Sequence, residues 1–316
     1  MTPVELLEQQ EQAPPQPAKW DRTKFIGGSD IAAVMGLSRW GTPLSLWAEK
    51  TGKLPADDLS NFEAAEIGTE LEEYVARKFA RKTGLQVRRR PEEYKHWDYP
   101  YMVCHIDRLI LDGKGVLSCK TTSAWKLKEW EGSSIPDEYV LQLMWELGLT
   151  RRPVGWIAVL IGGQKYLYKE IAFDQELFDK MVESARVFWD EFVLKDVPPV
   201  AIAGDQETMG LLYPSSEERT VLFENERAQE LNEFVQRRTD LIQVVKGTQE
   251  RLDEIEAKIK QHLGSAGAGE TDQFKFSWKS QSRTSVDAEK LKAEGLFEQY
   301  SKTASFRVLR TQRKAA

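Results

Sequence analysis

Cysteine, histidine and long apolar runs are all scarce in this chain of 316 residues. Two cysteines, Cys104 and Cys119, are too few for a disulfide scaffold, and three histidines argue against a histidine-rich transition-metal site. No segment reaches the roughly 18 consecutive apolar residues of a membrane-spanning helix. The first residues lack the basic start and apolar core of a secretory signal. We therefore expect a protein of the reducing cytosol with no membrane partner.

Positive charge is also in deficit, because the formal net charge is −6. This balance argues against a general polyanion binder, but the charges are unevenly spread. Acidic residues crowd between positions 57 and 73, whereas residues 280–316 carry eight Lys or Arg against four Asp or Glu. A separated distribution suits a protein that holds cations in one place and phosphates in another.

The chain is predicted to have three parts. Residues 1–19 are rich in Gln, Pro and Glu and are expected to form a disordered arm. Residues 20–200 alternate helical and strand patterns, which predicts an α/β core with a mixed central sheet flanked by helices. After Pro198-Pro199, residues 201–316 are expected to form a helical hairpin or coiled segment and a small strand and helix module that contacts DNA.

Apolar periodicity and turn signals predict individual elements. Ser29 is placed as the N-cap of a short helix over 31–35. A final strand is expected at SFRVLR, and a second hairpin at VGWIAVLIGG and QKYLYKEIAF. The other predicted helices cover 42–51, 62–83, 125–131, 136–149, 174–194 and 286–300.

A hairpin signal at Asp112-Gly113 places several polar residues together. If these two residues form the turn, paired positions sum to 225, so Asp107 faces Ser118 and His105 faces Lys120. Side chains alternate along a strand, so all four lie on one face. A carboxylate and a lysine on neighbouring strands can hold a divalent ion beside a phosphate. Taken alone, His105 is better explained as a structural residue that lines the site than as one that contacts substrate.

Four segments in this order resemble the YqaJ-like viral recombinase family, which includes the lambda-type exonuclease and lies in the PD-(D/E)XK nuclease superfamily. They are IGGSDIAAVMGLSRWGTPLSLWAEKTG, the Gly68–Glu72 motif, HIDRLILDGKGVLSCKT and IPDEYVLQLMWELGLT. The resemblance covers roughly residues 20–172. It implies a restriction-endonuclease-like core.

The resemblance assigns catalytic and metal-binding roles. Glu72, Asp107 and the backbone carbonyl of Cys119 match ligands of two Mg²⁺ or Mn²⁺ ions. Lys120 matches the lysine that orients or activates the attacking water. Gln142 matches a glutamine at the edge of the site.

The resemblance also assigns contacts to DNA. Arg22 and Ser29 match the pair that grips a terminal 5′-phosphate. Arg39 matches an arginine that enters the duplex where the strands separate. Tyr139 stands beside the glutamine motif and is grouped with these DNA-binding residues.

Ser118 departs from the family pattern, because the third motif of the family is Glu-x-Lys and this chain has Ser118-Cys119-Lys120. The position is catalytic and metal-binding in the family, and a hydroxyl is a poor substitute for a hard carboxylate ligand. Three explanations remain: the chain is catalytically impaired, it was altered to trap substrate, or another acid substitutes. Asp112 is a poor substitute because it lies in the turn. Under the first explanation, Ser118→Glu should raise the rate sharply.

The resemblance implies a Mg²⁺-dependent 5′→3′ exonuclease acting on double-stranded DNA ends, which leaves a 3′ single strand for annealing. It also implies a ring-shaped homotrimer, a partner single-strand annealing protein and a phage or prophage origin in a bacterial cytosol. Two alternatives stay open. One is a RecB-like nuclease of other specificity, and the other is a DNA-end-binding protein without catalysis, which Ser118 favours.

Overall fold

The computed structural model describes residues 21–55, 63–111, 115–303 and 306–312. The chain divides after Tyr213 into two compact units, which are treated separately below. The predicted disordered arm of residues 1–19 lies outside the described residues.

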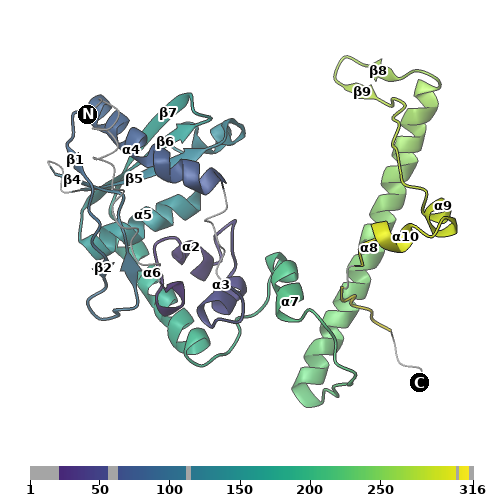
Figure 1. Cartoon of the computed structure of the whole chain (residues 1–316), viewed down its shortest axis with the longest axis horizontal. Helices are drawn as coiled ribbons and strands as arrows, with labels where there is room; N and C mark the ends of the chain where they lie inside the picture. The colour runs from purple at the N-terminus through teal and green to yellow at the C-terminus, as the bar shows by residue number, and fades with distance from the viewer. Residues whose placement is uncertain (1–20, 56–62, 112–114, 304–305, 313–316) are drawn as a thin grey trace. The chain divides into compact units, whose positions relative to one another are not determined.

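The first unit is built on a five-stranded sheet with the strand order β1-β4-β5-β6-β7 (Figure 1). Strands β5 and β6 run parallel, and every other neighbouring pair in this sheet is antiparallel. The predicted α/β class with a mixed central sheet is therefore confirmed. The strands are β1 (Val87–Arg88), β4 (Arg108–Ile110), β5 (Gly115–Thr122), β6 (Val154–Ile161) and β7 (Lys165–Ala172).

Helices cover both faces of this sheet because β5 and β6 bury side chains on both sides. Leu117 of β5 belongs to a buried cluster with Val75 and Phe79 of α4 (Glu63–Thr83). Its neighbour Val116 belongs to the other cluster, with Leu143 of α5 (Asp137–Thr150). Helix α5 connects the two parallel strands, so it forms the crossover between them.

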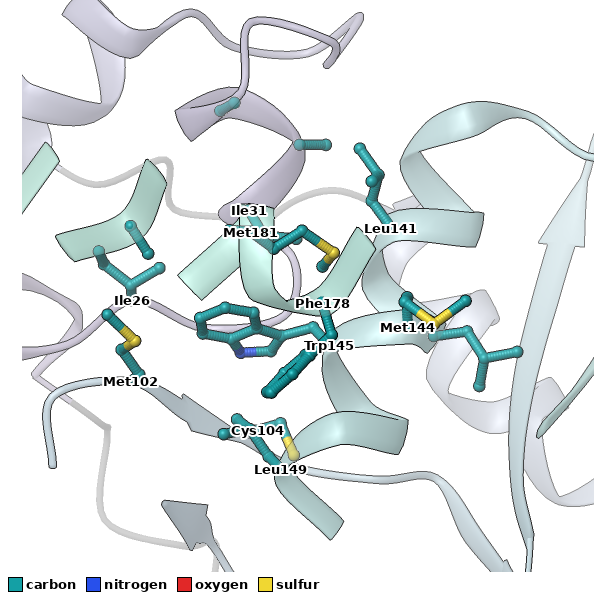
Figure 2. Close-up of a cluster of buried hydrophobic side chains, with 14 of the residues drawn as sticks. Ile26, Ile31, Met102, Cys104, Leu141, Met144, Trp145, Leu149, Phe178 and Met181 are labelled. Carbon is teal, nitrogen blue, oxygen red and sulfur yellow. The ribbon is translucent and has the colours of Figure 1, made fainter. Parts of the chain in front are cut away.

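The larger core centres on Trp145 of α5 and Phe178 of α6 (Gln175–Val187), whose ring centroids are 6.0 Å apart (Figure 2). The indole Nε1 of Trp145 donates a hydrogen bond of 2.9 Å to the carbonyl of Val103. A Cβ on Gly148 would come within 2.1 Å of the Phe178 ring, so only glycine permits this close approach of α5 and α6. These contacts fix the face of α5 that is turned toward β5.

Most of the predicted helices of the first unit are present. The segment predicted over 174–194 changes from α-helix α6 to a π-helical segment at Phe188. The remaining elements are η1 (Arg22–Lys24), α2 (Ile31–Val34), α3 (Pro43–Lys50), β2 (Tyr94–Lys95), β3 (Val103–Cys104), η3 (Ala124–Trp130), η4 (Phe188–Val193), η5 (Ala203–Asp205) and α7 (Gln206–Leu212).

The division between the units falls later than the Pro198-Pro199 boundary expected from the sequence. Asp205 is buried, and its carboxylate accepts hydrogen bonds from the hydroxyl of Thr42 and from the backbone N–H of Ile202. These bonds attach η5, and with it α7, to the first unit.

Two local predictions in the first unit are wrong. Asp30, not Ser29, is the N-cap of α2, and the Asp30 carboxylate accepts a bond from the N–H of Gly27 before the helix begins. The predicted strand through His105 and Asp107 is broken, because β3 turns away to pair with β2 in a separate two-stranded sheet. His105 is therefore not part of the ladder with β5, and its Nε2 lies 3.8 Å from a carboxylate oxygen of Glu93.

The predicted register of the hairpin is nevertheless confirmed. Arg108 pairs with Leu117 and Ile110 with Gly115, so the positions sum to 225. The Asp112-Gly113 turn itself lies outside the described residues.

The second unit contains one long helix, α8 (Asn225–Leu263), of 39 residues. A helical hairpin or a coiled segment was expected here, and of these the hairpin is wrong. No proline interrupts the segment, and pairs such as Glu254–Lys258 (2.5 Å) support its exposed surface. Strands β8 (Ala268–Glu270) and β9 (Lys275–Ser277) follow as a hairpin. Gly295, with φ +71°, separates α9 (Ala288–Ala293) from α10 (Phe297–Tyr300), where one helix was predicted.

The predicted final strand is also wrong for its described residues, 306–310, which adopt no regular structure. Across the described segments of the chain, no helix has the length and apolar character needed to cross a membrane.

Candidate active site

The backbone of β5 is held at its centre by an aspartate side chain. Asp107 lies at the bend before β4, and its Oδ2 accepts a hydrogen bond of 2.6 Å from the N–H of Cys119. Hydrogen bonds to an ionised carboxylate are shorter and stronger than neutral ones. The carboxylate is thus fixed beside the two side chains that flank Cys119, those of Ser118 and Lys120.

Lys120 connects β5 to α5. Its Nζ donates a hydrogen bond of 2.9 Å to Oε1 of Gln142 and lies 5.4 Å from the ring centroid of Tyr139. The amide Nε2 of Gln142 in turn donates a bond of 2.8 Å to Oε1 of Glu146. The predicted residues Lys120, Gln142 and Tyr139 are therefore brought together, and the network continues to Glu146.

Glu146 is the residue of this network that the sequence analysis missed. Its side chain is 1% exposed, and its Oε2 is buried without a hydrogen-bond partner in the described part of the chain. The pKa of Glu146 is raised to about 8, first by burial and then by the negative charge of Asp107, and Lys120 and the bond from Gln142 offset part of this rise. The signal in the sequence was a lone charge in the apolar stretch VLQLMWELGL, four residues after Gln142.

Glu72 has a different partner from the one that its predicted metal role needs. The guanidinium of Arg108, a residue 4% exposed, donates hydrogen bonds to the Glu72 carboxylate and, at 2.7 Å, to that of Glu73. The same guanidinium donates to the carbonyl of Asp107 at 2.6 Å. In the described residues, no three His, Cys, Asp or Glu side chains form a group able to hold a metal ion.

The oxygen atoms beside Lys120 nevertheless fit the binding of a divalent metal ion that prefers oxygen ligands. The hydroxyl of Ser118 and Oε2 of Glu146 are both buried and lack a hydrogen-bond partner in the described structure. Burial raises the pKa of the Cys119 thiol well above its usual range, so the thiol stays protonated and is a poor metal ligand. At this residue, the backbone carbonyl oxygen is the atom that could bind the ion. Mg²⁺ typically binds through one or two carboxylates, keeps several waters and also uses substrate phosphates, so three clustered acids are not required.

Of the residues predicted to bind the DNA end, Tyr139 belongs to this network, and Arg39 pairs with Glu138, the neighbour of Tyr139 on α5. Arg22 forms ion pairs with Asp30 at 2.8 Å and Glu49 at 3.2 Å. Ser29, Arg39 and the largely exposed Trp40 line a hollow of about 730 Å³. The nearest elements to it are α2, α3 and α7.

Arg39 is held by two carboxylates, with nitrogen–oxygen distances of 2.8 Å to Glu129 and 2.6 Å to Glu138. Hydrogen bonding to Glu129 raises the pKa of Arg39 above its usual value, so the guanidinium stays charged. A DNA phosphate at Arg22 or Arg39 would have to compete with these carboxylates.

The amino-acid sequence matches known proteins along most of its length. Residues 19–153 match the YqaJ-like viral recombinase domain. The uncharacterized protein YqaJ of Bacillus subtilis (strain 168) is 35% identical over 295 residues, which cover 91% of each chain. The chain belongs to the YqaJ-like viral recombinase family. The family resemblance drawn from the four motifs is thereby confirmed.

Solved structures resemble this YqaJ-like chain more distantly. The alkaline exonuclease LHK-Exo of Laribacter hongkongensis has 18% sequence identity and a TM-score of 0.47, covering 56% of this chain and 91% of that one. A phage related exonuclease from Haemophilus somnus 129PT has 14% identity and a TM-score of 0.37, covering 54% and 96%. The family assignment therefore rests on the sequence matches, and the roles of the individual site residues stay predictions.

Proposed function

We propose that this YqaJ-like protein is a divalent-metal-dependent deoxyribonuclease. It degrades the 5′-ended strand of duplex DNA and leaves a 3′ single strand for recombination by annealing. Membership of a viral recombinase family supports a role in recombination. The observation that carries the nuclease proposal is the arrangement around β5, where Asp107 is bonded to Cys119 and Lys120 to Gln142.

Each of these residues has a chemical part in phosphodiester hydrolysis. Asp107 and the carbonyl of Cys119 would hold Mg²⁺ or Mn²⁺, and we propose two ions in each site, with Glu72 contributing when Arg108 releases it. A bound ion lowers the pKa of water and stabilises charge on phosphoryl oxygens.

The other catalytic roles belong to the hydrogen-bonded residues that join β5 and α5. The ammonium of Lys120 orients the attacking water and stabilises the negative charge that develops on the phosphate. Gln142 and the Tyr139 ring fix the position of that ammonium.

Digestion of linear duplex DNA tests the proposal. The substrate carries a 5′-phosphate and a label at either the 5′ or the 3′ end, and the reaction contains Mg²⁺ or EDTA. We expect early release of labelled mononucleotide from the 5′ end with Mg²⁺ only, and a fall of about 100-fold or more for Lys120→Ala. Lys180→Ala, on the exposed surface of α6, is the control. Absence of digestion with either Mg²⁺ or Mn²⁺ would refute the nuclease.

A DNA-end-binding protein without catalysis is the second candidate. Two observations favour it: Ser118 lacks a carboxylate, and Arg108 neutralises Glu72. Fluorescence anisotropy with a labelled duplex separates the two candidates, because tight end binding without digestion supports the second one. Release of label first from the 3′ end would instead indicate a RecB-like nuclease of other specificity.

We also propose the assembly that the family resemblance implies. The protein would act in the bacterial cytosol as a homotrimer around duplex DNA and hand the 3′ strand to a single-strand annealing protein. Light scattering of the purified chain tests the trimer, and co-purification with a single-strand annealing protein tests the partnership.

A further inference from the structure

The proposed function calls for a metal-binding carboxylate at position 118, where this chain has a serine. Ser118 is 1% exposed, and its hydroxyl lacks a hydrogen-bond partner in the described part of the structure. A buried polar group without a partner is costly, so such a group calls for an explanation.

The topology determines which residue of α5 lies beside Ser118. Strands β5 and β6 are parallel and α5 joins them, so α5 runs in the opposite direction to β5. The hydrogen bond from Lys120 to Gln142 sets the register between strand and helix. Two residues back along β5 is about 6.6 Å, and four residues forward along α5 is about 6 Å. Glu146 therefore stands opposite Ser118, as Gln142 stands opposite Lys120.

Glu146 has an oxygen available at this position. Its Oε1 accepts the bond from Gln142, whereas its Oε2 is buried and, among the described residues, has no partner. A buried carboxylate is normally paired, fully hydrogen-bonded or bound to a metal. Ser118, on the facing strand, supplies a hydroxyl but no carboxylate at this position.

We propose that Glu146 supplies, from helix α5, the metal-binding carboxylate that position 118 lacks, and that it binds a divalent oxygen-preferring cation together with Asp107. The inference rests on the proposed function. Of the three explanations for Ser118, it selects substitution by another acid. The chain is then a competent enzyme, in which the carboxylate comes from Glu146 of α5 and not from position 118 of β5.

Mn²⁺ binding to the full chain, measured by electron paramagnetic resonance without DNA, tests this inference. We expect Glu146→Gln to weaken Mn²⁺ binding about tenfold or more. The variant keeps the shape of the side chain and still accepts the bond from Gln142, so a purely structural role would survive the change. Glu183→Gln, an exposed position on α6, should bind Mn²⁺ as the wild type does.

Substitutions at position 118 provide the second arm. We expect Ser118→Glu alone to change the Mn²⁺ affinity less than about threefold, because the carboxylate is already present. The double variant Ser118→Glu/Glu146→Gln should recover at least about tenfold over Glu146→Gln. Wild-type affinity in Glu146→Gln, a tenfold gain in Ser118→Glu alone, or a double variant as weak as Glu146→Gln would each overturn the inference.

The two proposals fail separately. Mn²⁺ binding that depends on Glu146, in a chain that does not digest DNA, refutes the proposed function and leaves the carboxylate assignment standing. If the chain digests DNA but Glu146→Gln does not change Mn²⁺ binding, the proposed function stands and the carboxylate assignment is refuted. A wild-type chain that binds no Mn²⁺ overturns the carboxylate assignment.

Discussion

The protonation of Glu146 should make the metal-free protein less stable as the pH rises. Burial raises the pKa of this carboxyl from 4.5 to about 8, so the folded chain holds a proton that the unfolded chain has released. The stabilising contribution is complete below the unfolded pKa of 4.5 and is lost as the pH rises through 8. Between about pH 6.5 and 8, this group alone lowers the free energy of unfolding by about 1.5 kcal/mol.

Urea unfolding in EDTA at several pH values measures this loss, and Glu146→Gln is the comparison because an amide does not titrate. We expect the stability of the wild type relative to Glu146→Gln to fall by about 1.5 kcal/mol across this range. Burial lowers the pKa values of His96 and His105, but both histidines titrate in both proteins and so cancel in the difference. A stability difference that stays constant with pH would show that Glu146 is ionised in the folded chain.

Three further predictions concern the rest of the molecule. Lys50→Met removes the ammonium that lies 2.8 Å from the buried carboxylate of Asp30, which keeps its ion pair with Arg22, and should cost about 1–3 kcal/mol in urea unfolding; an unchanged stability would contradict the buried pair. Arg22→Ala should reduce the preference for 5′-phosphate over 5′-hydroxyl ends in digestion rates, and unchanged discrimination would exclude Arg22 from end recognition. Removal of residues 280–316 should flatten the salt dependence of DNA affinity by about 0.9 for each phosphate that this segment neutralises, whereas an unchanged slope would assign the segment to assembly or partner binding.

Local signals in the sequence were enough for much of the fold. The Asp112-Gly113 signal predicted the register of β4 and β5, and the structure pairs Arg108 with Leu117 as that prediction requires. The helix predicted over 42–51 is present as α3, which begins after Thr42 with a capping box and Pro43 in its first turn. Both features depend on residues close together in the chain.

Other features depended on contacts that no local pattern reveals. The strand predicted through His105 is interrupted because β3 pairs with β2, a segment that the sequence left unassigned. Ser29 satisfies the pattern of an N-cap, but the Asp30 carboxylate is drawn to Lys50 and Arg22 from elsewhere in the chain. The boundary after Pro198-Pro199 moved because Asp205 bonds to Thr42.

The sequence predicted most residues of the candidate site but missed one of them. The resemblance named Asp107, Lys120, Gln142 and Tyr139, and the structure brings the last three together beside the Asp107–Cys119 bond. Glu146 went unnoticed because its significance lies in burial and in an unpartnered oxygen, which become visible only once α5 is packed against β5.

The hydrogen bond between Asp107 and the backbone of Cys119 has a practical consequence for spectroscopy. A short bond of 2.6 Å to a carboxylate should move the amide proton of Cys119 to an unusual chemical shift and slow its exchange with solvent. Any event that redistributes charge on that carboxylate changes this one resonance, without a label in the site. The amide resonance of Cys119 thus reports the arrival of an ion or a DNA end at β5.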